Sequence, residues 1–178
     1  MVTGTREALL DAAARLLAGG GVEAVTLREV GRQAGVSHNA PYKHFPSKEA
    51  LLAALAAREL ERRADRAAES LADTLRGYIR WALDSPALFR LIFGPWTVDS
   101  PELHHAATAA QARFVDTVLA AQQADLLPAG DPVRLASLLR ALAHGAADLA
   151  AAGHLSAGGK GNADPEDLVD DLLAYLRP

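Results

Sequence analysis

The chain has 178 residues, half of them hydrophobic, no cysteine and a formal net charge of −4 at pH 7. This length allows one or two domains with a sizeable core, and the lack of cysteine excludes disulfides, thiolate metal sites and a cysteine nucleophile. The sequence has neither a signal-peptide pattern nor eighteen apolar residues in succession, so we expect a cytoplasmic protein that does not contact the membrane.

The first predicted helix follows Thr5. Thr5 is a suitable capping residue, and Glu7 in the first turn interacts favourably with the helix dipole. Apolar residues at helical spacing form its buried face, and the three glycines at 19–21 end it. The members of that face are Leu9, Leu10, Ala13, Leu16 and Leu17. This helix is expected to support the core.

Two short helices joined by a tight turn are predicted next. Thr26 and Glu29 have the spacing of a capping box, so a helix begins at Leu27. Gly35 ends it, because glycine adopts the left-handed conformation at little cost. Ser37 is expected to cap a second helix that runs to Phe45. This is a helix-turn-helix pattern.

The second of these helices carries donor-rich side chains suited to groove edges and phosphates. They are His38, Asn39, Tyr42, Lys43 and His44. Residues 1–50 hold six Lys/Arg and five Asp/Glu, so the rest of the chain carries a net charge of −5 and the small basic set lies on the motif. The alternative is an ordinary helical hairpin with solvated charges.

The motif extends beyond the hairpin. It comprises Thr5-Arg6, Ala12-Ala13, Leu16-Leu17, Gly21, Thr26-Leu27, Ala34-Gly35-Val36-Ser37, Tyr42-x-His44-Phe45 and Lys48-Glu49-x-Leu51. These residues resemble the tetracycline-repressor-like (TetR) family of transcriptional regulators. The family usually has an aliphatic residue where this chain has Pro41. A weaker resemblance, to the subclass with a Trp-His-Gly-named C-terminal domain, involves residues 78–93 and His144-Gly145.

The resemblance implies a DNA-binding set, in which Tyr42, His44 and Lys48 hold phosphates while His38 and Asn39 face base edges. The complete expected set is Thr26, Arg28, Ser37, His38, Asn39, Tyr42, Lys43, His44 and Lys48. Its expected partner is double-stranded operator DNA.

The remainder of the chain is predicted to be helical throughout. Ser47 caps a long run with a break between about Arg62 and Asp73, and four later helices each begin at a proline that follows a capping residue. These helices are predicted over 86–93, 101–126, 132–152 and 165–176. No strand pattern competes. We therefore expect an all-α protein, with a three-helix DNA-binding domain at 1–50 and a helical bundle for ligand binding and dimerisation at 51–178.

Aromatic residues and one histidine indicate a ligand pocket in the second domain, a prediction to which the resemblance contributes. They are Tyr78, Trp81, Phe89, Phe93, Trp96, Phe114 and His144. The alternative is that the aromatics simply fill the core of an Ala-rich domain. His144 and Asp148 share a helix face and could bind a metal, although a buried polar contact is the more common role of such a pair. No metal site, cofactor or catalytic motif is predicted.

A homodimer is expected from the last two helices. In the helix from Pro132, a leucine stripe is expected to cover the core, while Ala136, Ala143, Ala147 and Ala151 allow a second helix to approach. Ala143→Glu is then expected to abolish operator binding. The stripe comprises Leu135, Leu138, Leu139, Leu142, Ala146 and Leu149, and Leu168, Val169, Leu172, Leu173 and Leu176 form its counterpart in the last helix.

These features together predict a ligand-responsive transcriptional regulator that binds a (pseudo)palindromic operator as a dimer and is released by a small apolar or aromatic effector. Two other classes stay open at this point. One is an all-α dimeric interaction module that keeps the helix-turn-helix shape without reading DNA. The other is an enzyme, for which the sequence offers neither paired carboxylates nor a nucleophile in a recognisable motif.

Overall fold

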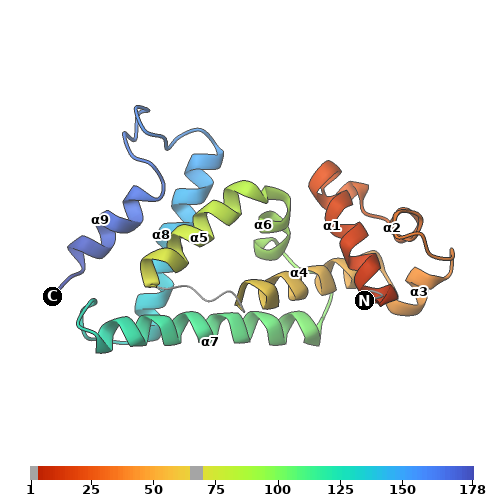
Figure 1. The fold of residues 1–178 in the computed structure, drawn as a ribbon, viewed down its shortest axis with the longest axis horizontal. Helices are drawn as coiled ribbons and strands as arrows, with labels where there is room; N and C mark the ends of the chain where they lie inside the picture. The colour runs from red at the N-terminus through yellow and green to blue at the C-terminus, as the bar shows by residue number, and fades with distance from the viewer. Residues whose placement is uncertain (1–3, 65–69) are drawn as a thin grey trace. The chain divides into compact units, whose positions relative to one another are not determined.

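The computed structural model of the chain describes residues 4–64 and 70–178 (Figure 1). Within these residues there are nine helices and no strand, which confirms the all-α prediction. The chain divides into two compact units: unit 1 is Met1–Asp65 with Ser85–Ala109, and unit 2 is Arg66–Asp84 with Ala110–Pro178. The helices over 48–64 and 86–93 therefore belong to the same compact unit as the N-terminal helices. The functional boundary after residue 50 stays a prediction.

Unit 1 is built around its first helix, which packs against four of the others. Its elements are α1 (Thr5–Ala24), α2 (Leu27–Gln33), α3 (Ala40–His44), α4 (Lys48–Ala64), α6 (Pro86–Phe93) and the start of α7 (Pro101–Gln123). The packing partners of α1 are α2, α3, α4 and α6. Fully buried side chains such as Leu9, Val30 and Leu51 come from three helices, so the core forms where these meet.

The ends of α1 follow the sequence in part. Thr5 is the first helical residue and makes no side-chain cap; Gly4 precedes the helix, so the predicted cap at Thr5 is wrong. A capping side chain must stand outside the helix to reach the free amides, and Thr5 already lies inside it. Gly20 and Gly21 leave helical geometry, with φ of 67° at Gly21, as the glycine run predicts.

An ion-pair cluster joins α4 to α1. Arg58 is only 8% exposed, and its Nη1 lies 3.0 Å from Glu7 Oε2 and 2.8 Å from Asp11 Oδ1. A guanidinium can be buried at acceptable cost when carboxylates pair with it and accept its hydrogen bonds. The cluster therefore fixes the distal half of α4 against α1.

Unit 2 contains α5 (Leu71–Asp84), the rest of α7, α8 (Pro132–Ala151) and α9 (Asp167–Tyr175). The break predicted between Arg62 and Asp73 lies between the end of α4 and the start of α5, and its middle, residues 65–69, is outside the described residues. Ser70 caps α5, because its Oγ accepts from the Asp73 amide at 3.1 Å. Three of the four proline starts are confirmed, while α9 begins two residues later than predicted.

The predicted division of α8 into two faces is observed only in part. Leu139 and Ala146 of the predicted core stripe are buried and Ala151 of the other face is exposed, as expected, but other positions differ. Ala136, Ala143 and Ala147 are buried, whereas Leu138 and Leu149 are 67% and 49% exposed. The physical reason lies in α5, which packs on α8 and contributes large buried side chains of its own. Small residues on α8 let the two axes approach, so Ala136, Ala143 and Ala147 face the chain's own core together with Leu139, while Leu138 and Leu149 face outwards.

Two ion pairs attach α9 to α5. Arg76 pairs with Asp170, and Arg80 Nε lies 3.1 Å from Glu166 Oε1. The hydrogen bond to Asp170 raises the pKa of Arg76 above its already high value, so this guanidinium stays charged. These contacts and the buried Val169 hold α9 in place, with Tyr175 84% exposed at its end.

Candidate nucleic-acid interface

The start of α2 has the predicted capping geometry. Thr26 is extended, and its Oγ1 accepts from the Glu29 amide at 3.1 Å. Glu29 also receives two hydrogen bonds from Arg32, at 2.9 and 2.5 Å, which lower the pKa of its carboxyl. Arg28, on the exposed side of the same turn, makes no ion pair within the described residues, so its charge is available to a phosphate.

The turn after α2 also has the predicted geometry. Gly35 has φ of 67°, in the left-handed region that glycine adopts without strain. The Gly35 amide donates to Arg32 O and the Val36 amide to Gly31 O, both at 3.2 Å, so the last carbonyls of α2 are satisfied. Val36 packs partly buried against the unit 1 core and anchors the turn.

The second helix of the helix-turn-helix pattern is shorter than predicted. α3 begins at Ala40, and Ser37, His38 and Asn39 form a turn before it; no side-chain cap is present. The predicted start after Ser37 is therefore wrong. The Ser37 carbonyl accepts from the Ala40 amide at 2.9 Å, because Pro41 has no N–H to make the bond that would extend the helix backwards.

The residues expected to contact DNA lie mostly on the exposed side of this region. Pro41 and Phe45 point into the unit 1 core, and the residues between them, with the turn before α3, are exposed. Tyr42 is 51% exposed, which is uncommon for an aromatic side chain with nothing to bind. The exposed members of the expected set are Thr26, Arg28, Ser37, His38, Asn39, Tyr42, Lys43 and His44.

Lys48 extends the same set from the start of α4. It is partly exposed and, within the described residues, makes no ion pair; Lys43 makes none either. Ser47 caps α4 as predicted, its Oγ accepting from the Ala50 amide at 3.2 Å. The carboxyl pKa of Glu49 is lowered by hydrogen bonds to its own amide and to Ser47, so this carboxylate is held at the helix start.

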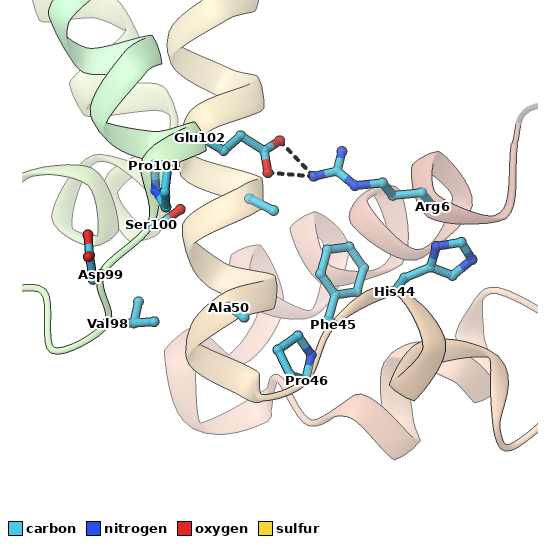
Figure 2. Close-up of a pocket in the computed structure, with 11 residues that line it drawn as sticks. Arg6, His44, Phe45, Pro46, Ala50, Val98, Asp99, Ser100, Pro101 and Glu102 are labelled. Carbon is cyan, nitrogen blue, oxygen red and sulfur yellow. Dashed lines mark hydrogen bonds and ion pairs between the residues drawn. The ribbon is translucent and has the colours of Figure 1, made fainter.

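A hollow of about 300 Å³ lies beside the end of α3 (Figure 2). Arg6 crosses it and donates from Nη2 to Glu102 Oε1 and Oε2, at 2.6 and 2.8 Å. The central carbon of the Arg6 guanidinium lies 5.5 Å from the centre of the Phe45 ring. Since Arg6 and Glu102 are 96 residues apart, no local pattern could have predicted the pair. Arg6 therefore contacts both Glu102 and Phe45, the residue that follows α3.

The residues expected to bind a ligand are found in both units. In unit 2, Tyr78 Oη lies 2.8 Å from His144 Nδ1, and the Tyr78 and Trp81 ring centres are 6.0 Å apart. Asp148 Oδ2 is 3.6 Å from His144 Nε2, one turn along α8. Phe114, on α7, has the Arg140 guanidinium 5.8 Å from its ring centre. Tyr78, Trp81 and His144 thus form a single contact group, which we call the α5–α8 triad.

The other three aromatics belong to unit 1. Phe89 is buried on α6, and its ring centre lies 5.0 Å from that of Phe93, which is 42% exposed. Trp96 packs against the unit 1 core and donates from Nε1 to Ile92 O at 3.3 Å. None of the seven residues expected to bind a ligand lines the hollow beside α3.

The described residues contain neither a metal-binding group nor a membrane-spanning helix. No group of three or more His, Asp or Glu side chains there is arranged to hold a metal ion. No helix in that part of the chain is both long and apolar enough to cross a bilayer.

Comparison with known families identifies the fold. Residues 71–176 match the tetracyclin repressor-like C-terminal domain, and residues 9–55 match the bacterial regulatory proteins of the tetR family. The first match alone covers more than half of the chain. The chain belongs to the TetR family. The resemblance noted in the sequence is thereby confirmed, while assignment to the Trp-His-Gly subclass stays a prediction.

Individual relatives agree with this assignment. A protein of unknown function from Rhodococcus sp. RHA1 is 32% identical, with a TM-score of 0.79 over 99% of this chain and 97% of that one. The reduced form of E. coli NemR has the same fold, with a TM-score of 0.70 and 21% identity over 98% of each chain. The HTH-type transcriptional repressor KstR of Rhodococcus jostii (strain RHA1) is 46% identical over 57 residues, which span 27% of its length.

Membership of the TetR family makes this chain a transcriptional regulator and not an enzyme. The family also implies operator binding and dimerisation.

Proposed function

We propose that this TetR-family regulator is a repressor that binds a (pseudo)palindromic operator as a homodimer and is released by a small apolar or aromatic effector. The observation that carries this proposal is the exposure of donor-rich side chains on the turn before α3 and on α3 itself, while Pro41 and Phe45 anchor the same segment in the core. KstR, which is 46% identical over 57 residues, is described as a repressor. The alternative of a non-reading interaction module offers no reason for these exposed donors.

The proposed contacts divide by chemistry. The DNA phosphates are held by Lys48, Tyr42 and His44. These contacts fix the orientation of the protein on DNA but carry no sequence information. His38 and Asn39, with Ser37 and Lys43 in support, face base edges, where an amide or imidazole distinguishes hydrogen-bond patterns. At the start of α2, Thr26 and Arg28 add further contacts to the DNA backbone.

Substitution of Lys48 and Asn39 tests this division. Lys48→Ala is expected to weaken binding equally on all sequences and to reduce the salt slope by about one unit, because one phosphate charge is no longer neutralised. Asn39→Ala is expected to change preference at particular base pairs by about 1–3 kcal/mol. Binding isotherms at several salt concentrations measure both effects. Arg15→Ala, an exposed cation on α1 outside the set, is the control and should change neither.

A mobility shift with the DNA flanking the protein's own gene separates the repressor from the interaction module. The repressor is expected to give a salt-sensitive shift that unrelated DNA does not compete away. If purified dimer binds neither this DNA nor any sequence selected from a random pool, the interaction module is the better description.

The dimer interface is proposed on the outward face of α8 together with α9. This face contains Leu138, Leu142 and Leu149, and Tyr175 extends from the end of α9. Exposed leucines at helical spacing on one helix are costly in water and are stabilised when a second copy covers them. A two-fold axis then places two recognition helices on half-sites about 34–36 Å apart.

Effector binding is proposed at the α5–α8 triad. Tyr78 and His144 provide a polar pair at 2.8 Å beside Trp81, which is 9% exposed. A small aromatic molecule can stack near the indole while its polar group engages Tyr78 or His144. Release from DNA requires that the effector bind more tightly to the conformation with lower operator affinity, with a typical coupling of about 1–3 kcal/mol.

Tyr78→Phe tests the polar part of this site. It is expected to weaken an effector that carries a hydrogen-bonding group by about 3- to 10-fold, because one hydrogen bond of about 1 kcal/mol is lost. Ligands are found by quenching of Trp81 and Trp96 fluorescence, and Trp96→Phe leaves Trp81 as the reporter. Tyr175→Phe, at an 84% exposed position, is the control. By reciprocity a true effector binds the DNA-bound dimer more weakly, so equal affinity for free and bound protein excludes that ligand as an inducer.

A further inference from the structure

Pro41 determines where the recognition helix begins. It is buried, whereas Tyr42 and Lys43 beside it are exposed. Because proline has no amide hydrogen, the Ser37 carbonyl four residues earlier cannot accept the bond that would extend the helix backwards, and it accepts from Ala40 at 2.9 Å instead. Ser37, His38 and Asn39 are therefore presented from a turn.

Pro41 packs closely against Gly31 of α2. A Cβ at Gly31 would lie 2.7 Å from Pro41 Cγ and 3.4 Å from its Cδ. Real carbon atoms do not approach so closely, and the closed pyrrolidine ring cannot swing aside as a linear side chain can. Both residues are buried, so the ring fills the space that glycine leaves and α3 packs directly on α2.

We infer that Gly31 and Pro41 form a matched pair that selects the operator by keeping residues 37–39 in a turn before the recognition helix. Both are positioning residues that act through His38 and Asn39. This inference rests on the proposed DNA binding, and adds which feature of the chain decides the angle at which its base-reading side chains are presented. A five-residue helix has little stability of its own, so its geometry depends on this packing.

Pro41→Leu and Pro41→Ala restore the missing amide. In the free protein, the backbone chemical shifts of Ser37 and His38 are expected to move towards helical values, because an amide at position 41 can donate to Ser37 O, whereas Asn39 already has helical angles. Operator selection from a randomised pool is then expected to change by about 5- to 150-fold at the base pairs that face His38 and Asn39. The salt slope should stay as in the wild type, since no phosphate contact is removed.

Gly31→Ala tests the packing of Pro41 against Gly31. The added methyl group displaces Pro41, so we expect operator affinity to fall by about 5-fold or more. The double variant Gly31→Ala, Pro41→Ala should bind as Pro41→Ala does, because the atom that clashes has been removed. Gly19→Ala, where an added Cβ meets nothing within 4 Å, is the matched control and should bind as the wild type.

Two results overturn the inference. One is a Pro41→Leu protein that is folded by thermal melting yet keeps both the wild-type shifts at 37–39 and the wild-type base preference. The other is a double variant that binds operator clearly more weakly than Pro41→Ala alone. If the wild type binds no operator, the proposed function fails, but the shifts and melting temperatures of the four variants still decide whether Gly31 and Pro41 are coupled.

Discussion

The double variant Leu138→Glu, Leu149→Glu is expected to be a folded monomer that has lost operator binding by about 100-fold or more. Both leucines are largely exposed in the single chain, so glutamate is tolerated there before assembly. In the proposed dimer the same positions are covered, and burial of unpaired carboxylates costs several kcal/mol. A monomer presents one recognition helix and makes half of the contacts. Sedimentation at micromolar concentration and operator titration measure the two effects.

Leu126→Glu is the matched control for this variant. Leu126 is 54% exposed in the same unit but lies in the connection after α7, outside the outward face of α8 and outside α9. It should remain dimeric and bind operator normally. A Leu138→Glu, Leu149→Glu protein that sediments as the wild-type dimer would place the interface elsewhere.

Ala143→Glu is expected to destabilise unit 2 by about 4 kcal/mol or more. Its side chain is 0% exposed on the face of α8 that packs against α5. Glutamate there combines overpacking with burial of an ionisable group, and each of these costs several kcal/mol. Loss of operator binding, which the sequence predicts for this change through the dimer, is then expected to follow from partial unfolding of unit 2.

Chemical denaturation compares Ala143→Glu with Ala141→Glu. Ala141 is exposed two residues earlier on the same helix, so glutamate there should change stability by less than about 0.5 kcal/mol. Equal stability of the two variants would show that the alanine stripe does not face the core.

The elements that sequence reasoning predicted well are those with local causes. Thr26, Ser47 and Asp131 cap their helices through amides two or three residues away, and these spacings are visible in the sequence. Proline starts at 86, 101 and 132 belong to the same class. A capping side chain and a missing amide act within one turn, so no tertiary information is required.

The features that were missed depend on partners far away in the chain. Apolar residues lie on more than one side of α8, and which of them are buried depends on the large side chains that α5 packs against this helix. Arg58 can be buried because it forms ion pairs with Glu7 and Asp11, about fifty positions earlier in the chain. The late start of α3 had a local cause in Pro41, and the missing amide there could have been read from the sequence.

The buried alanines of α4 restrict how this chain can evolve. Ala53, Ala54, Ala56 and Ala57 are at most 3% exposed, so α4 is enclosed on more than one side. A larger residue at these positions overpacks the core, and glycine lowers helix stability by about 1 kcal/mol. Both larger and smaller residues are therefore disfavoured along this segment, and divergence among relatives should accumulate instead at exposed positions such as the turn before α3.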